Sequence, residues 1–330
     1  MNEDDILADL ARHFPDSHAS LLLGRGDDAA VVASDTPLCV SSDLFLEDVH
    51  FRRDYFHPAE IGHKALAVNI SDMAACGARP LGFSLCLGLP PDVGSGWLDD
   101  FFSGMAALAR RHDCVLSGGD LSACARLCIA VTIWGAGANR GVPLLRGGCK
   151  PGDALFVVGQ PGLARVGLRV LETSGRGAAT LWPDSCAAHL KPLPLVEEAV
   201  RIACLPGVVR PPSLMDVSDG IARDLPRLLQ GREATRSLGA ALCVGENDLH
   251  EETRCFAVEQ GLDPVGEYLL GGEDYALLGA CAREDLAALR KAVPRLRPLG
   301  VVTDKAEITI NGIPFTAAGF DHFAPGEVCG

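Results

Sequence analysis

Segments with strand and helix periodicity follow one another in mixed order along the whole chain. In the first half, strand-like segments at 31–40, 44–51, 81–89, 114–116 and 127–134 surround helices expected at 58–76 and 96–111. In the second half, strands at 154–158, 213–217, 240–244 and 275–281 alternate with helices at 163–172, 194–204, 220–229 and 285–293, with a surface excursion at 175–188. This order predicts a mixed α+β first half and an α/β second half.

The length of 330 residues favours two domains over one. The string RGGCKPGD at 146–153 combines Gly, Pro and charge without periodicity, which is typical of a boundary. We therefore predict an N-terminal domain over 1–150 and a C-terminal domain over 151–330. Near the end of the chain, the Asn311-Gly312 pair between apolar residues predicts a β-hairpin.

Charge and cysteine usage exclude several classes of protein. Asp and Glu number 43 against 29 Lys and Arg, and the net charge of −14 disfavours binding to nucleic acid or to an anionic membrane. No apolar run approaches the ~18 residues of a membrane span, and residues 1–10 are acidic, unlike a signal peptide. The 13 cysteines include no CxxC pair. We expect reduced thiols in a cytoplasmic protein.

Aspartates recur in short segments rich in Gly and Ser. The segments are Gly26-Asp27-Asp28, Ser41-Ser42-Asp43, Asn69-Ile70-Ser71-Asp72, Gly118-Gly119-Asp120 and Asp216-Val217-Ser218-Asp219-Gly220. One interpretation is turn chemistry alone, because Asp and Gly are common in turns and Asp219 could cap the helix that follows it.

Two of these aspartates fit turn chemistry badly. Asp72 lies late in an apolar helix, where the helix dipole and burial both disfavour an anion. Asp216 lies at the end of an apolar strand, and α/β proteins bind ligands at the carboxyl ends of their strands. Each is therefore expected to have a cation as partner.

The type of cation follows from the other residues of these segments. The sequence has no P-loop and no pair of histidines at zinc spacing. Carboxylates accompanied by hydroxyl groups favour Mg²⁺, and glycine turns beside them can donate N–H groups to phosphate oxygens. The pattern predicts a nucleotide site in which aspartates hold Mg²⁺ and Mg²⁺ holds phosphates.

Eight strings spread over nearly the whole chain resemble the thiamine-monophosphate kinase family, within the superfamily of aminoimidazole ribonucleotide synthetase and selenophosphate synthetase. They are GDDAAVV (26–32), SSDLFLEDVHF (41–51), IGHKALAVNISDMAACGARP (61–80), SGGDLS (117–122), LLRGGCKPGD (144–153), MDVSDGIARDL (215–225), GGEDYALL (271–278) and GFDHF (319–323). The resemblance implies ATP-dependent phosphorylation of thiamine monophosphate to thiamine diphosphate. It also implies a homodimer in which the N-terminal sheets form a barrel and the C-terminal domain completes the substrate cleft.

The resemblance also implies roles for individual residues. Mg²⁺ ligands are expected at Asp28, Ser41, Ser42, Asp43, Asp72, Asp120, Asp216 and Asp219. Contacts to ATP are expected at Gly119, Asp120, Arg146 and Ser218, and contacts to thiamine monophosphate at His50, Glu273 and Phe320. No general base is expected, because a phosphate monoester has its second pKa near ~6 and is already anionic at neutral pH. Several Mg²⁺ ions and Arg146 would stabilise the charge during in-line transfer.

Two other functions stay open from the sequence. Another ATP-dependent enzyme of the superfamily is one, such as a hydrogenase-maturation dehydratase that uses a C-terminal cysteine, for which Cys329 is the candidate. A non-catalytic nucleotide-binding protein is the other. Acidic side chains gathered in one cleft without a ligand would repel one another, and this disfavours the second alternative.

Overall fold

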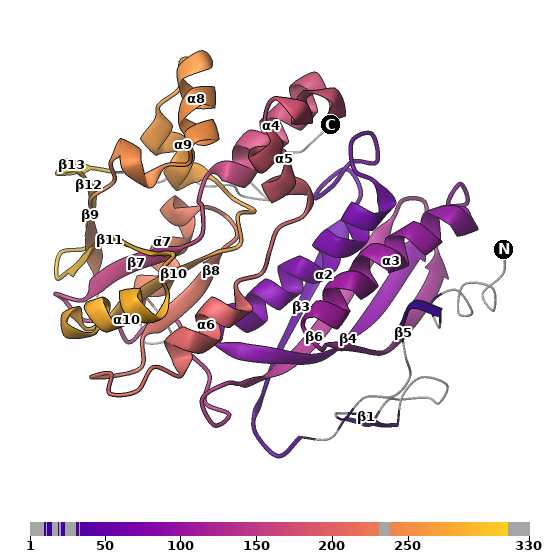
Figure 1. The fold of residues 1–330 in the computed structure, drawn as a ribbon, viewed down its shortest axis with the longest axis horizontal. Coiled ribbons are helices and arrows are strands. Elements are labelled where there is room, and N and C mark those ends of the chain that lie inside the picture. The colour runs from indigo at the N-terminus through magenta and orange to yellow at the C-terminus, as the bar shows by residue number, and fades with distance from the viewer. Residues whose placement is uncertain are drawn as a thin grey trace. The chain divides into compact units, whose positions relative to one another are not determined.

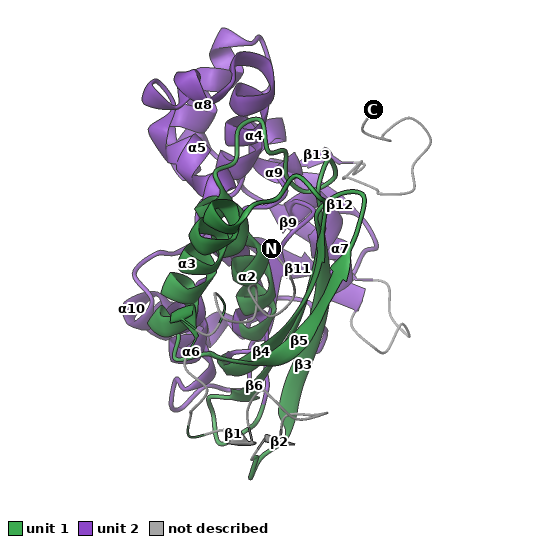
Figure 2. Cartoon of the chain, turned by 90° about the vertical axis from the view of Figure 1, so that its right-hand side faces the viewer, with its two compact units in different colours: residues 1–73, 79–142, 329 green, residues 74–78, 143–328, 330 purple. Residues whose placement is uncertain are grey.

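The computed structural model of the chain describes residues 10, 12–14, 19, 21–23, 31–32, 34–230 and 238–315. The chain divides into two compact units: residues 1–73, 79–142 and 329 form unit 1, and residues 74–78, 143–328 and 330 form unit 2 (Figure 2). The sequence also predicts a short amphipathic helix over residues 4–14, which falls largely outside the described residues.

Unit 1 is built on a four-stranded sheet with two long helices beside it (Figure 1). The strands, in sheet order, are β3 (Leu38–Leu46), β6 (Cys128–Gly137), β4 (Ala78–Leu89) and β5 (Val115–Ala123), and the helices are α2 (Pro58–Ala75) and α3 (Ser95–Arg111). β3 runs antiparallel to β6, whereas β4 and β5 are parallel. A separate two-stranded sheet contains β1 (Leu21–Leu23) and β2 (Val31–Val32).

The two helices of unit 1 approach each other at glycines. A Cβ atom on Gly62 of α2 would lie 2.0 Å from the carbonyl oxygen of Phe101, and one on Gly104 of α3 would lie 1.9 Å from that of Ala59. The apolar side chains of α2 are almost all buried, including Leu66. This burial explains why α2 lacks a polar face, and it makes the polar residues that α2 does carry candidates for function.

Unit 2 contains a seven-stranded sheet covered by short helices (Figure 1). Its strands, in sheet order, are β13 (Ile313–Pro314), β12 (Ile308–Ile310), β9 (Gly239–Leu242), β11 (Leu296–Thr303), β7 (Ala154–Val158), β10 (Ala276–Cys281) and β8 (Ser213–Val217). Its α-helices are α4 (Leu163–Ser174), α5 (Pro183–Leu190), α6 (Val196–Ala203), α7 (Ile221–Gln230), α8 (Glu251–Glu259), α9 (Pro264–Leu270) and α10 (Leu286–Ala292). Single 3₁₀ turns, η1 (Arg176–Thr180), η2 (Glu246–Asp248) and η3 (Arg283–Asp285), complete it.

The strands β7, β10 and β8 of unit 2 lead to the loops that carry several of the predicted site residues. All three are fully buried, and β10 is antiparallel to both neighbours. The carboxyl ends of β7 and β8 therefore meet the beginning of β10 at one end of the sheet. Three loops leave the sheet there, at residues 159–162, 218–220 and 271–275.

The mixed α/β class predicted from the sequence is confirmed, and so are several elements. The strand at 154–158 and the helix that begins at Pro58 have their predicted positions. Asn311 and Gly312 join β12 to β13 with φ of 52° and 83°, the left-handed values that this type of hairpin turn requires.

Three predictions about local structure were wrong. Residues 41–43 are not a turn between two strands, because β3 runs without interruption from Leu38 to Leu46. Residues 118–120 likewise lie inside β5. Both are edge strands with exposed side chains, so polar residues and glycines are tolerated there without ending the strand. The excursion expected at 175–188 contains η1 and most of α5, whose buried positions include Cys186.

Helices of the described residues are all too short or too polar to cross a membrane.

Candidate active site

Two carboxylates meet in unit 1 between β3 and α2. Side chains alternate along a strand, so Ser41 and Asp43 share the face of β3 that meets Asp72 of α2. Ser41 Oγ donates a hydrogen bond to Asp72 Oδ2 at 2.5 Å. Burial, the charge of Asp72 and a side-chain hydrogen bond with Asp72 raise the pKa of Asp43 from 3.8 to about 6. The protein thus brings together two acids that repel each other when both are ionised.

This donor set fits Mg²⁺. Carboxylate and hydroxyl oxygens are the ligands that the ion prefers, and a divalent cation would relieve the repulsion that raises the pKa of Asp43. The Ser42 side chain lies apart from this pair, because strand alternation turns it to the other face of β3. There its Oγ lies 2.7 Å from Thr132 Oγ1 of β6.

Gly119 and Asp120 lie on β5, at the opposite edge of the sheet from β3. β6 and β4 separate the two strands, and neighbouring strands are about 4.8 Å apart, so three strand spacings of roughly 14 Å in total lie between β3 and β5. Gly119 has a structural reason to be glycine: a Cβ atom there would lie 1.7 Å from the carbonyl oxygen of Leu85 on β4.

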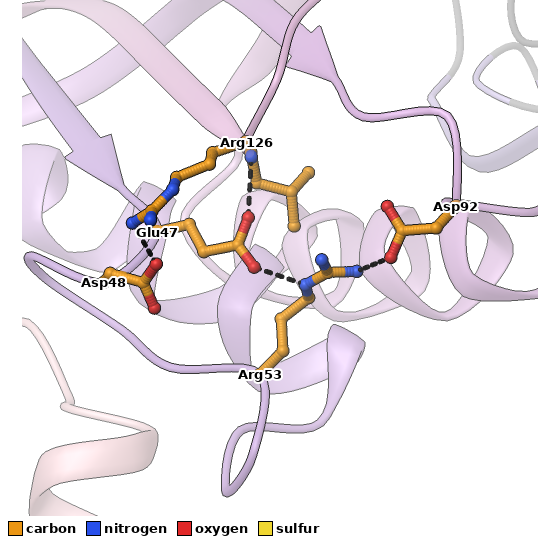
Figure 3. Close-up of polar contacts among 6 residues, drawn as sticks. Glu47, Asp48, Arg53, Asp92 and Arg126 are labelled. Carbon is orange, nitrogen blue, oxygen red and sulfur yellow. Dashed lines mark hydrogen bonds and ion pairs between the residues drawn. The ribbon is translucent and has the colours of Figure 1, made fainter.

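Ion pairs hold the turn that follows β3 (Figure 3). Glu47, which is largely buried, accepts from Arg53 Nε at 2.5 Å, and Arg53 Nη1 donates to Asp92 Oδ2 at 2.7 Å. Asp48, with a left-handed φ of 65°, pairs with Arg126. The chain thereby reverses tightly between 47 and 51.

His50 is presented by this turn. Its Nδ1 accepts a hydrogen bond from the backbone N–H of Leu46 at 3.0 Å, and its ring stacks on Phe45 with centroids 5.7 Å apart. A nitrogen that accepts a hydrogen bond carries no proton, so the neutral ring holds its proton on Nε2. In this tautomer, Nε2 of His50 is the hydrogen-bond donor of the ring.

In unit 2, Asp216 and Asp219 lie at the carboxyl end of β8 in different surroundings. Asp216 is a buried residue of the strand, registered with Leu277 of β10. Asp219 does not cap α7 as the alternative interpretation suggested, because the helix begins at Ile221 and Gly220 directly precedes it. Asp219 Oδ2 accepts from Arg227 Nη1 at 2.7 Å and lies 3.6 Å from Arg223 Nε.

Asp224 holds the loop after β8, although no pattern in the sequence singled it out. Its Oδ2 accepts from the backbone N–H groups of Ser218 and Asp219 at 3.1 and 3.0 Å, and its Oδ1 accepts from Arg227. Burial raises the pKa of Asp224, while these hydrogen bonds and Arg227 act in the opposite direction. The loop that holds Ser218 is fastened through this carboxylate.

Glu273 lies in the loop before β10. Its Oε2 is 3.2 Å from Nδ1 of His189, a buried residue of α5. The next residue, Asp274, accepts from the backbone N–H groups of Gly162 and Ala164 at the start of α4. Burial raises the pKa of Asp274 to about 7, and the two N–H donors lower it in part.

The remaining predicted site residues are spread along the chain. Arg146 is exposed in the connection between β6 and β7. Asp28, Phe320 and the alternative nucleophile Cys329 lie outside the described residues. Within the described ranges, no three His, Cys, Asp or Glu side chains of the single chain form a group that could hold a metal ion. Asp43 with Asp72 belong to unit 1, and Asp216 with Asp219 belong to unit 2.

The N-terminal part of the chain matches a known class of domain. Residues 26–137 match the AIR synthase related protein family at its N-terminal domain. A thiamine-monophosphate kinase of Mycobacterium tuberculosis is 33% identical over 92% of this chain and 87% of its own length. A crystal structure of thiamine-monophosphate kinase from Stenotrophomonas maltophilia is 30% identical with a TM-score of 0.78, covering 94% of this chain and 95% of that chain.

A structure of AaThiL complexed with AMPPCP and TMP is also similar, with 26% identity and a TM-score of 0.75 over 90% of this chain and 91% of that chain. The identity and coverage of these relatives settle the family. The chain belongs to the thiamine-monophosphate kinase family.

Proposed function

We propose that this chain transfers the γ-phosphoryl group of ATP to thiamine monophosphate and releases thiamine diphosphate and ADP. Membership of the family over nearly the whole chain carries the proposal. The related AaThiL complex contains AMPPCP, an analogue of ATP, together with TMP, the two kinds of ligand that this reaction needs.

The reaction requires positioning more than acid–base chemistry. A phosphate oxygen of thiamine monophosphate attacks the γ-phosphorus, a new P–O bond forms, and the bond to the β–γ bridging oxygen breaks. The attacking oxygen is already anionic at neutral pH, so no side chain needs to remove a proton. The chain's task is to hold two anionic substrates in line despite their repulsion.

Mg²⁺ is the cofactor that the acidic residues would hold. The pair of Asp43 and Asp72 with the Ser41 hydroxyl supports this role, because its oxygens converge and its charge needs compensation. The full proposed set of ligands is Asp28, Ser41, Ser42, Asp43, Asp72, Asp120, Asp216 and Asp219. When bound, Mg²⁺ would neutralise phosphate charge and so reduce the repulsion between the substrates.

Substrate contacts are proposed from the residues around these acids. Gly119, Asp120, Arg146 and Ser218 would contact ATP. His50, Glu273 and Phe320 would contact thiamine monophosphate: His50 through the Nε2 proton, and Glu273 and Phe320 through the positive thiazolium ring. A cation over an aromatic face is worth ~0.5–2 kcal/mol.

We also propose a homodimer that forms through the sheet of unit 1. On the face of β3 opposite Asp43, Val40 and Leu44 are 65% and 58% exposed, an apolar surface on an edge strand. Asp43 and Asp120 lie on opposite edges of one sheet, so a joint site is easiest to build from Asp43 of one copy and Asp120 of another. A cytoplasmic location agrees with the cysteines, because those of the described residues are free thiols.

The direct test is an assay of the purified chain with ATP, MgCl₂ and thiamine monophosphate, with thiamine diphosphate measured by chromatography. Parallel reactions replace thiamine monophosphate with thiamine, with an aminoimidazole precursor or with selenide, or replace MgCl₂ with EDTA. We expect product only from the complete reaction. Absence of thiamine diphosphate at every Mg²⁺ concentration, from protein that is folded by circular dichroism, would exclude the proposed function.

A further inference from the structure

Glu273 sits in strained backbone. It has a φ of 61°, and Tyr275 two residues later has a φ of 48°. Left-handed conformations are unfavourable for a non-glycine residue and persist only where surrounding contacts impose them. Two such residues flank Asp274, so the contacts of this loop must be strong enough to hold both.

The loop is held from two sides. Asp274 Oδ2 accepts from Gly162 N at 2.6 Å and Oδ1 accepts from Ala164 N at 2.8 Å, which places the carboxylate on the N-terminus of α4. On the other side, the backbone N–H of Glu273 donates to the carbonyl oxygen of Ser218 at 2.7 Å. The carboxylate of Asp274 fills the position at the helix N-terminus where an external anion could otherwise bind.

Neighbouring glycines bring these segments into direct contact. A Cβ atom on Gly271 would lie 2.4 Å from the Cα atom of Gly162, and one on Gly272 would lie 2.7 Å from the carbonyl oxygen of Ser218. The backbone of Gly271 and Gly272 therefore lies in direct contact with the start of α4 and with the residue that follows β8.

His189 contacts the side-chain carboxylate of Glu273. The imidazole is 1% exposed, and its Nδ1 lies 3.2 Å from Glu273 Oε2, while the Glu273 side chain keeps 26% exposure. The position of α5 that carries His189 is set by α4, because a Cβ atom on Gly167 of α4 would lie 2.0 Å from the carbonyl oxygen of Ser185 and 3.0 Å from Cβ of His189. One helix thus supports both the backbone and the carboxylate of Glu273.

We propose that Asp274 and His189 are positioning residues that set the carboxylate of Glu273 for the thiamine ring system. The inference rests on the proposed function, in which Glu273 contacts thiamine monophosphate. The advantage of such support is that a carboxylate held in place loses little side-chain freedom when the cationic substrate binds.

The test compares His189→Leu with His189→Asn, whose amide places an N–H donor where Nδ1 stands. His189→Leu should raise KM for thiamine monophosphate at least tenfold while KM for ATP stays within twofold of the wild type, and His189→Asn should stay within threefold for both. Arg165→Gln is the matched control on α4: it removes one of the two arginines that pair with Glu267 and should leave both KM values unchanged.

The possible results separate the two proposals. An inactive wild type excludes the proposed function itself. An active wild type with an unchanged KM for thiamine monophosphate in His189→Leu overturns the positioning role, and so does a parallel change of both KM values without rescue by Asn.

If His189→Leu does not fold, the comparison of His189→Asn with His189→Gln decides. His189→Asn should retain a lower KM for thiamine monophosphate than His189→Gln, since Gln places its N–H donor nearer to Nε2. Equal KM values overturn the inference. Asp274→Asn, which can accept only one of the two N–H donors, should raise the same KM selectively.

Discussion

Asp43 on β3 and Asp72 on α2 share a side-chain hydrogen bond although both are acids. Ser41 donates a second hydrogen bond to Asp72. Burial and mutual repulsion raise the pKa of Asp43 to about 6, so between pH 3.8 and 6 the folded protein retains a proton there that the unfolded chain has released. An arrangement that costs stability at neutral pH is typical of a site kept for function.

The metal-free protein should lose stability as pH rises from about 4 to above 6. Between pH 3.8 and 6 the folded state binds more protons at Asp43 than the unfolded state, so the free energy of unfolding falls with pH there. Asp43→Asn should reduce this slope and leave the part that comes from Asp274, whose pKa burial raises to about 7. In EDTA at pH 8, that variant should be more stable than the wild type, on the order of 1–3 kcal/mol, while its activity with Mg²⁺ is lost. Urea unfolding at pH 5 and pH 8 measures the effect.

The control for this experiment is Asp35→Asn, since Asp35 is an exposed acid before β3. It should unfold like the wild type at both pH values. An unchanged pH dependence in Asp43→Asn would contradict the assignment of the proton to the Asp43–Asp72 pair.

Mixing two inactive variants tests whether each site uses two copies of the chain. Asp43→Asn and Asp120→Asn should each be inactive alone. After co-refolding in equal amounts, half of the dimers contain one chain of each kind, and each of these has one intact site if Asp43 and Asp120 come from different copies. Activity should then recover to about a quarter of the wild-type value, as measured by initial rates. If both aspartates of a site come from one chain, the mixture stays inactive.

Gly119→Ala should destabilise the protein by about 1–3 kcal/mol, because the new Cβ collides with the backbone of Leu85 and β5 must shift. The same shift would displace Asp120 and lower the affinity for ATP. Gly118→Ala is the matched control, because a Cβ atom on Gly118 meets nothing within 4 Å. Thermal melts with and without ATP measure both effects, and equal behaviour of the two variants would contradict the explanation.

Arg53→Leu should lower the free energy of unfolding by about 1–3 kcal/mol, because the largely buried Glu47 loses its ion-pair partner (Figure 3). It should also raise KM for thiamine monophosphate several-fold, because the turn that presents His50 loosens. Arg126→Leu breaks the pair with Asp48, which is exposed on both sides, and should change stability by less than about 1 kcal/mol. Substrate titrations and urea unfolding distinguish them. A larger effect from Arg126 than from Arg53 would show that another contact holds the turn.

Local patterns in the sequence predicted much of the fold. Helical spacing after Pro58 predicted α2, and Asn311-Gly312 predicted the final hairpin, because both depend on interactions between residues close in the chain. Asp72 could be singled out for the same reason: an acid near the end of an apolar helix conflicts with its local surroundings. The strand β3 was misread because Ser41 and Asp43 favour turns locally, whereas pairing with β6 keeps them extended.

By itself, the sequence determined the mixed α/β class, the acidic motifs and their resemblance to one kinase family. Only the tertiary structure decided which acids share surroundings. It pairs Asp43 with Asp72, places Asp120 on the far edge of the sheet, and puts His189 beside Glu273. No motif marked His189, because its contact with Glu273 joins α5 to a loop far along the chain. Such contacts depend on how helices and strands pack, and spacing within one segment carries no information about them.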